Sequence, residues 1–147
     1  MKAIVIYKAG DAQQLQLEER PIPTLKEGWT LVKIKGFGIN RSEIFTRQGH
    51  SPSVIFPRIL GIECVGVVEA TTSPTLQKGQ TVVSLMGEMG RAFDGSYAEK
   101  ITQLFAYIDE HNVPVAPEKV FALEEIVAAH QYVESSAGYG KVVVRIN

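Results

Sequence analysis

Apolar and polar residues alternate along much of the first hundred residues. In residues 30–35, Val32 and Ile34 alternate with Lys33 and Lys35. If this segment is a strand, the lysines face water and the aliphatic side chains face a core. Three further segments rich in valine and isoleucine are predicted strands: residues 3–7, 64–69 and 81–85. Proline and glycine separate these segments, a pattern typical of a barrel or sandwich of short strands.

One helix is predicted among these strands, at residues 40–48. Asn40 suits the N-cap, and Glu43 lies in the first turn, where the helix dipole favours a negative charge. Gly49 follows the last turn and ends the helix.

The pattern changes after Lys100. Helical spacing of apolar residues predicts one helix at residues 101–110 and a second at residues 123–134. The apolar stripe of the second contains Leu123, Ile126, Val127, His130 and Val133. On that stripe, His130 is expected to be a partly buried packing residue rather than a ligand or base. A turn at residues 135–140 and a closing strand at residues 141–146 complete a chain that is mainly β with short helices (α+β).

Composition and charge restrict the classes of partner. The chain has 147 residues, 45% of them hydrophobic, which suits a single domain with one sizeable core. Its net charge of −1 provides no basic field, so neither nucleic acid nor an anionic membrane is an expected partner. The apolar start at residues 1–6 is too short for a signal peptide, and no later run approaches a membrane span. We expect a cytoplasmic protein.

Candidate metal and thiol chemistry is sparse. A single cysteine, Cys64, excludes an internal disulfide and any zinc site made of several cysteines. Its apolar surroundings favour a core position over a reactive thiol. The three histidines, His50, His111 and His130, are scattered without ligand spacing.

The glycine-rich turn of dinucleotide-binding domains is absent. Gly36-Phe37-Gly38 is followed by Asn40-Arg41 where a third glycine is needed, and the glycines at 138 and 140 precede a predicted strand instead of following one. The His-Glu-x-x-His, Gly-x-Ser-x-Gly and phosphate-loop motifs are absent as well.

Several strings, in this order and spacing, resemble the medium-chain dehydrogenase/reductase superfamily in its quinone oxidoreductase-like branch. The strings are the start at residues 1–6, LEERPIP at 17–23, GFGINRSEIFTRQG at 36–49, LGIECVGVVEA at 60–70, MGEMGRAFDGSYAEK at 86–100 and KVFALEEIVAAHQYVESSAGYGKVVVRI at 119–146. The resemblance implies a GroES-like β-barrel.

The resemblance also implies that one domain is missing. Family members carry a Rossmann domain between the Tyr-Ala-Glu string and the C-terminal tail, whereas here Lys100 runs straight into Ile101. We therefore expect a single GroES-like catalytic domain over residues 1–147. Residues 1–100 would form the barrel core, residues 101–147 the C-terminal helices and the returning strand, and the Rossmann domain would be absent between 100 and 101.

The resemblance also excludes a catalytic zinc site, because the ligand positions of the zinc-dependent members can be compared one by one with this sequence. Zinc-dependent members carry a cysteine where Asn40 stands and a histidine where Ile62 stands. Glu63 and Cys64 alone cannot supply the three protein ligands of a catalytic site. The four-cysteine structural lobe expected after residues 81–85 is missing too.

By the same resemblance, Asn40 is the expected catalytic and cofactor-binding residue, its amide orienting substrate or nicotinamide; a helix N-cap is the compatible alternative. Phe45, Ile62 and Arg91 are the expected substrate-binding residues. Many family quinone reductases have a tyrosine at the position of Phe45, so stacking on substrate and packing in the core are both open for this ring. Arg47, His50 and Arg91 line a pocket or are solvated loop charges.

Without zinc, quinones and enones are the expected small-molecule substrates, because hydride transfer to a conjugated system needs only modest stabilisation of the resulting anion. The resemblance implies NADPH in the full-length parent, with NADH also open. We expect no cofactor on this chain, no activity alone, and weak self-association through the exposed interdomain surface. The alternative is a stand-alone GroES-like binding module, and a longer reading frame encoding a glycine-rich turn would distinguish the two. A co-chaperonin shares the barrel only.

Overall fold

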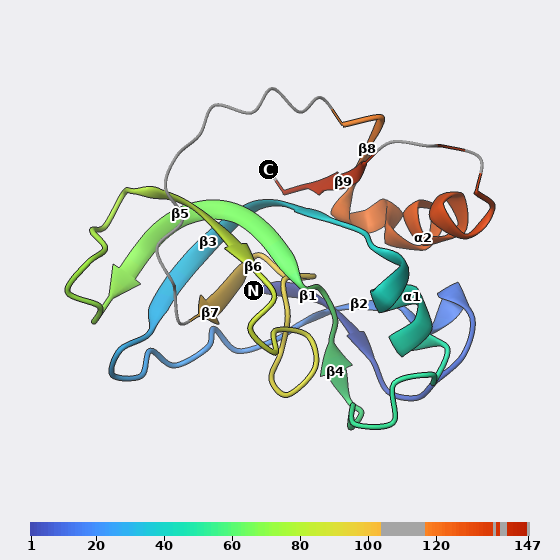
Figure 1. Ribbon diagram of the computed structural model, residues 1–147, viewed down its shortest axis with the longest axis horizontal. Coiled ribbons are helices and arrows are strands. Elements are labelled where there is room, and N and C mark those ends of the chain that lie inside the picture. Colours follow the sequence, from blue (N-terminus) through green and yellow to red (C-terminus); the bar gives the residue numbers. More distant parts are fainter. Residues whose placement is uncertain (104–116, 137, 139–140, 147) are drawn as a thin grey trace.

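The computed structural model describes residues 1–103, 117–136, 138 and 141–146 (Figure 1). These residues form a three-stranded sheet in the order β2-β1-β4 and a six-stranded sheet in the order β6-β5-β3-β9-β8, with β7 also paired to β3. Two α-helices lie side by side at one end of the sheets (Figure 1). The expected class, mainly β with short helices, is confirmed.

The small sheet is built on β1 (Lys2–Ile6), which pairs antiparallel with β2 (Gln16–Glu19) and β4 (Arg58–Ile59). It joins the rest of the barrel through the backbone, because the N–H of Ile4 donates to the carbonyl of Tyr97 at 2.8 Å. The sequence pattern did not predict β2 or β4.

The large sheet is centred on β3 (Thr30–Gly38), with the expected alternation along its length. Val32 and Ile34 are completely buried while Lys33 and Lys35 are exposed. β3 pairs antiparallel with β5 (Glu63–Thr71), which in turn pairs with β6 (Thr81–Leu85).

The other side of β3 is shared by two strands. Its first half pairs with β7 (Lys100–Gln103) and its last residues pair with β9 (Val142–Arg145). β8 (Lys119–Ala122), which was not predicted, adds a parallel strand to β9.

The helices at residues 40–48 and 123–134 are confirmed. α1 is Arg41–Arg47, and α2 is Ile126–Glu134 with a 3-10 turn at Leu123–Glu125 before it. A further 3-10 turn lies at Ala12–Gln14.

The helix predicted at residues 101–110 is wrong at its start, and residues 104–110 lie outside the described part of the chain. Residues 101–103 belong to β7, where Ile101 pairs with Val32 and is buried to 2% exposure. Free backbone groups of β3 were available there, and a strand satisfies them.

The C-terminal segment completes the core of the barrel instead of forming a separate unit. Its buried residues Phe121, Leu123, Ile126, Ala129, Val142, Val144 and Ile146 belong to the same cluster as the buried residues of β1, β3 and β5. His130 is fully buried, not partly buried as expected, and its Nε2 lies 3.0 Å from the Tyr97 hydroxyl. The Tyr97 ring stacks on Phe37 at 4.5 Å between ring centroids.

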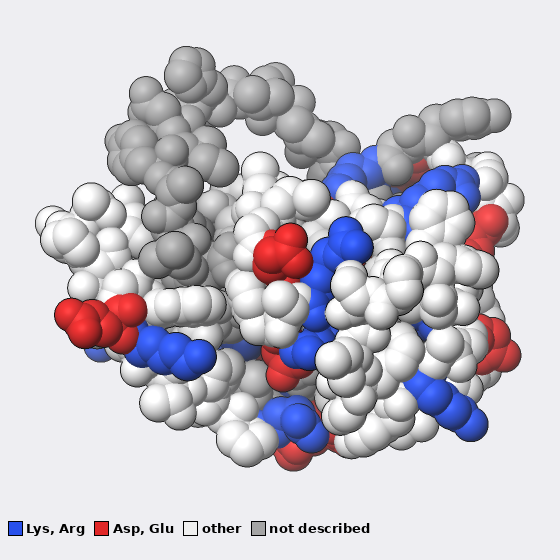
Figure 2. Space-filling view, turned by 60° about the horizontal axis from the view of Figure 1, so that its bottom comes forward, with Lys and Arg blue, Asp and Glu red and all other residues white. Residues whose placement is uncertain are grey.

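The surface carries charges of both signs, and on the face drawn in Figure 2 they are interspersed. None of the helices in the described ranges is long and apolar enough to cross a membrane.

Candidate functional site

A pocket of about 420 Å³ lies between α1, the segment before β5 and the turns after β6. Its lining residues are Ser42, Glu43, Phe45, Thr46, His50, Ser51, Leu60, Ile62, Met86, Gly90 and Arg91. Gly61, between the lining residues Leu60 and Ile62, has a backbone φ of 104°. A Cβ on this residue would lie 2.8 Å from both the Ser96 nitrogen and the Tyr97 ring, so only glycine fits this close approach.

Glu43 holds the pocket wall together from inside. Its side chain is buried, and its carboxylate accepts the backbone N–H of Asn40 at 2.8 Å and that of Ile62 at 3.2 Å. One carboxylate therefore joins the start of α1 to the loop before β5. Burial raises the pKa of the Glu43 carboxyl, while these hydrogen bonds act in the opposite direction.

Next to Glu43, the Asn40 amide is held by three charged side chains. Its Nδ2 donates to Glu63 Oε1 at 3.2 Å and to Glu43 Oε1 at 3.3 Å, and its Oδ1 accepts from Lys141 Nζ at 2.7 Å. Lys141 also forms an ion pair with Glu63. Turning the amide over would set its oxygen against two carboxylates, so the charges fix its orientation.

Strand register brings Lys141 to this place. The Ile39 N–H donates to the Val142 carbonyl at 3.2 Å, which aligns the residue before β9 with Asn40. Gly38 lies under the Lys141–Glu63 pair, and a Cβ there would overlap the Glu63 carboxylate and come within 2.7 Å of Lys141 Nζ.

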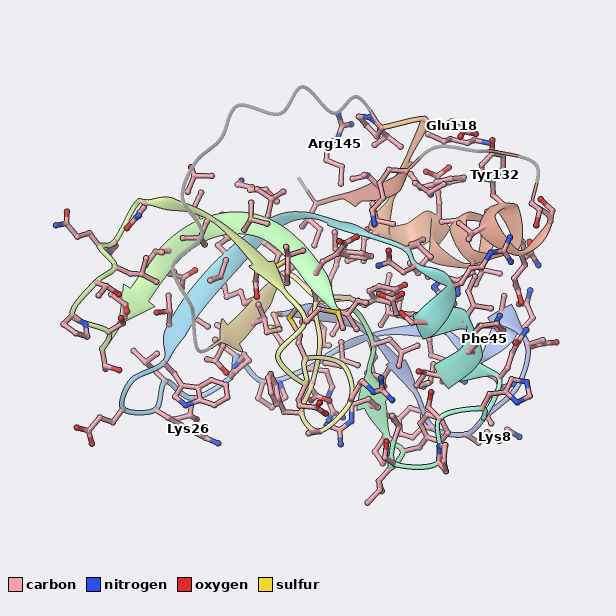
Figure 3. All side chains as sticks on the ribbon, viewed as in Figure 1. Lys8, Lys26, Phe45, Glu118, Tyr132 and Arg145 are labelled. Carbon is pink, nitrogen blue, oxygen red and sulfur yellow. The ribbon has the colours of Figure 1, made fainter. Side chains whose placement is uncertain are left out.

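The expected site residues fall in two neighbouring groups. Phe45, Ile62, Arg91 and His50 line the pocket, whereas Asn40 does not line it and touches it only through Glu43. Phe45 extends from α1 and is 54% exposed, so packing in the core, one of its two alternatives, is wrong (Figure 3).

Both expectations for Arg47 are wrong, since it neither lines the pocket nor is solvated. Its side chain is fully buried and donates to the Gly10 carbonyl and to Glu134 Oε1, each at 2.6 Å. Arg47 thereby joins α1 to α2 and to the loop before the 3-10 turn at Ala12–Gln14.

Sequence reasoning missed the roles of Glu43, Glu63 and Lys141. Glu43 was seen only as a first-turn charge, and Lys141 only as the first residue of the closing strand expected at residues 141–146. A usable signal was the pair of glycines Gly36 and Gly38 in a strand, because glycine in a strand interior often marks close approach of other groups.

The residues present do not fit a zinc ion. Among the described residues, no group of three or more histidine, cysteine, aspartate or glutamate side chains is arranged to hold a metal. A lysine ammonium is bound to Asn40 and Glu63 where a metal cation would need free ligands. Cys64 is a core residue, as expected, and burial raises the pKa of its thiol to about 12, so it offers no thiolate at neutral pH.

We accordingly expect protein purified without any chelator to contain far less than one zinc per chain. The ammonium of Lys141 and the missing ligands at Asn40 and Ile62 are the physical reasons. Elemental analysis by mass spectrometry measures this directly. A zinc content close to one per chain that survives dialysis would contradict the expectation.

Comparisons with known proteins are consistent across sequence and structure. A family model described as zinc-binding dehydrogenase matches residues 49–144. The pig (Sus scrofa) quinone oxidoreductase is 27% identical over 124 residues, which cover 82% of this chain and 35% of that protein. This chain spans only 20% to 35% of the lengths of the first curated relatives it matches.

Two solved structures share the fold. The quinone oxidoreductase from Coxiella burnetii superposes with a TM-score of 0.83 at 12% identity, covering 100% of this chain and 99% of that one. The Escherichia coli quinone oxidoreductase, solved in complex with NADPH, superposes with a TM-score of 0.62 at 24% identity, covering 71% of this chain and 31% of that one.

Proposed function

Because this chain belongs to the zinc-binding dehydrogenase family, in the quinone oxidoreductase-like branch of the medium-chain dehydrogenase/reductase superfamily, we propose that it is the catalytic domain of a nicotinamide-dependent quinone or enone reductase. The observation that carries the proposal is the pocket beside Asn40. Its walls include Phe45, Leu60, Ile62 and Met86, which suit a flat apolar molecule.

The chemistry that we propose uses no metal ion. A hydride carries two electrons to a conjugated carbon or oxygen, and the negative charge that develops on the substrate oxygen must be met by hydrogen-bond donors or cations of the protein. Quinones and enones spread this charge over a conjugated system, which lowers the demand on the site. Asn40, held by Glu43, Glu63 and Lys141, is the residue we assign to orient the nicotinamide or substrate beside the pocket.

NADPH is the proposed hydride donor, supported by the E. coli quinone oxidoreductase solved with that cofactor. The domain that would hold its adenosine and pyrophosphate is proposed to be absent between β7 and β8. This position differs from the junction between residues 100 and 101 that the sequence predicted. β7 contains both of those residues and pairs with β3 along its whole length, so the proposed junction comes after β7. We propose that the described residues form one GroES-like domain and that this domain is inactive alone.

A chimaera tests the function. The nucleotide-binding domain of pig quinone oxidoreductase would be inserted between β7 and β8, and NADPH-dependent reduction of 1,4-naphthoquinone would be measured. We expect turnover, and a loss on the order of 10- to 100-fold in kcat/KM for Asn40→Ala, because orientation of the reacting groups is lost. Lys78→Ala, on the exposed turn between β5 and β6 and outside the lining of the pocket, is the matched control. A chimaera that binds NADPH but reduces neither quinones nor enones would refute the proposal.

The isolated domain is also expected to self-associate weakly through an apolar surface on its edge strand. On and beside β6, the side chains of Val83, Leu85 and Met86 are about half exposed, at 49%, 49% and 57%. Exposed apolar patches of this kind favour association. We expect sedimentation coefficients that rise with concentration, and a monomer after Val83→Lys with Leu85→Lys. If the unsubstituted chain stays monomeric at every concentration, this apolar surface does not cause self-association.

A further inference from the structure

Most polar side chains of the pocket are hydrogen-bonded to other groups of its wall, so they are not free for a ligand. Thr46 Oγ1 donates to the Ser42 carbonyl at 2.9 Å and lies 2.8 Å from Ser51 Oγ. Ser42 Oγ donates to Glu43 Oε2 at 3.3 Å, and Glu43 accepts two backbone N–H groups in addition. These four side chains are used within the wall itself.

His50 and Arg91 differ from the other polar lining residues. Both side chains are exposed, and neither makes a side-chain hydrogen bond or ion pair with any described residue. The His50 ring lies edge-on to the Phe45 ring at 6.2 Å between centroids. His50 and Arg91 are the donors of this pocket that can turn to a ligand without breaking a hydrogen bond to a described residue.

The apolar walls define the rest of the ligand. Phe45, Leu60, Ile62 and Met86 offer an aromatic face and aliphatic contacts, but no hydroxyl group. A ligand that fits both sets of groups has a flat conjugated body and one strongly accepting oxygen. An anionic oxygen forms shorter and stronger hydrogen bonds with guanidinium than a neutral oxygen does.

We infer that this pocket is an oxyanion site, which binds a planar phenolate or enolate with its ring against Phe45 and Ile62 and its oxygen at Arg91 and His50. The inference deepens the proposed function and rests on it, because hydride addition to a quinone or enone leaves such an anion. Glu43 is the one acidic side chain of the lining. Its carboxylate is directed to Asn40 and Ile62, whose N–H groups it accepts.

The test compares two probes of nearly equal shape on the isolated chain. These are 2,4-dinitrophenolate, which carries the anionic oxygen at neutral pH, and 1,3-dinitrobenzene, which lacks it. Dissociation constants come from calorimetry, and methyl NMR shifts of Ile62 and Met86 report the location. We expect the phenolate to bind about tenfold more tightly or better.

Variants separate the roles. Arg91→Met is expected to remove the preference for the phenolate while leaving 1,3-dinitrobenzene unaffected, and Arg91→Lys to restore part of it. His50→Gln keeps a side-chain donor at this position and is expected to lose less than Arg91→Met. Lys26→Met is the matched control. Lys26 lies by a second cavity of about 360 Å³ containing Trp29 and Phe93.

Three outcomes would overturn the oxyanion site: equal affinity for the two probes, loss of the preference in Lys26→Met, or no binding of either probe. His50, Arg91 and Lys26 are all exposed, so the variants should melt at the same temperature as the unsubstituted chain, and unfolding is not a competing explanation. The result is independent of turnover. A chimaera without quinone reductase activity would refute the proposed function even if the phenolate binds here.

Discussion

Unfolding free energy is expected to fall steeply as the pH drops below about 6.5, and His130 is the main cause. Burial, together with the nearby charge of Arg47, lowers the pKa of His130 to about 3 from its ordinary 6.5. The unfolded chain therefore binds a proton between these values that the folded chain rejects. The contribution of neutral His130 to the free energy of unfolding is fully present above pH 6.5. It is lost progressively toward pH 3, at about 1.4 kcal/mol per pH unit.

The packing around His130 explains why the proton is rejected. Its Nε2 contacts the Tyr97 hydroxyl at 3.0 Å, and its buried Nδ1 has no hydrogen-bond partner among the described residues. The neutral imidazole is thus held in the core beside a buried guanidinium, where a second positive charge would be strongly disfavoured. Glu43 acts in the opposite direction, because its raised pKa means that the folded state gains stability on protonation of that carboxyl as the pH falls.

Urea unfolding at several pH values between about 7 and 5 measures the effect, with an expected loss from His130 of about 2 kcal/mol over that window. The matched variant is His130→Leu combined with Tyr97→Phe, which removes the titrating group without leaving a lone hydroxyl. Its unfolding free energy should no longer fall between pH 7 and 5, and protonation of Glu43 should make it rise as the pH falls. If the double variant does not fold, NMR titration of the His130 ring decides the question. A midpoint close to 6.5 in the folded parent would contradict the account.

How much of this fold could be predicted depended on the range of the interactions. The alternation of Val32 and Ile34 with Lys33 and Lys35 is a local property, and it identified β3 correctly. β7 was mistaken for a helix because the spacing of a few apolar residues after Lys100 does not reveal that β3 offers unpaired backbone groups. Two-residue β4 has no pattern at all.

The site shows the same limit more sharply. Phe45, Ile62 and Arg91 were expected to bind substrate, and the structure places all three in the lining of one pocket, while their role in binding stays a prediction. Lys141 and Asn40 are 101 residues apart in the chain, and only the pairing of β9 with β3 brings them together. Arg47 was misplaced because an arginine on a short helix is usually solvated, and nothing in the sequence indicated Glu134 as its partner.

The second large effect concerns the nicotinamide cofactor, which the isolated chain is expected to bind in the millimolar range or not at all. Dinucleotide-binding domains hold the pyrophosphate with amides of a glycine-rich turn and a helix N-terminus. This sequence contains no such turn. What remains is the region around Asn40, which we propose contacts the nicotinamide end alone.

The size of the loss follows from the missing contacts. Hydrogen bonds to charged groups contribute roughly 1.5–3 kcal/mol each, and every 1.4 kcal/mol changes a dissociation constant about tenfold. Two or three missing bonds to the pyrophosphate therefore remove several powers of ten in affinity. Because no hydride donor is bound, turnover should be lost with it, even if the pocket at Phe45 and Arg91 still accepts a quinone.

Calorimetric titration of the isolated chain with NADPH, followed by an assay of 1,4-naphthoquinone reduction on the same sample, tests the central claim that this chain is a catalytic domain separated from its cofactor domain. The account predicts only heats of dilution up to about millimolar cofactor, and no quinone reduction above the rate without protein. The chimaera carrying the inserted nucleotide-binding domain is the positive control and should bind and turn over. Micromolar binding of NADPH to the isolated chain, or steady quinone reduction by it, would contradict the claim.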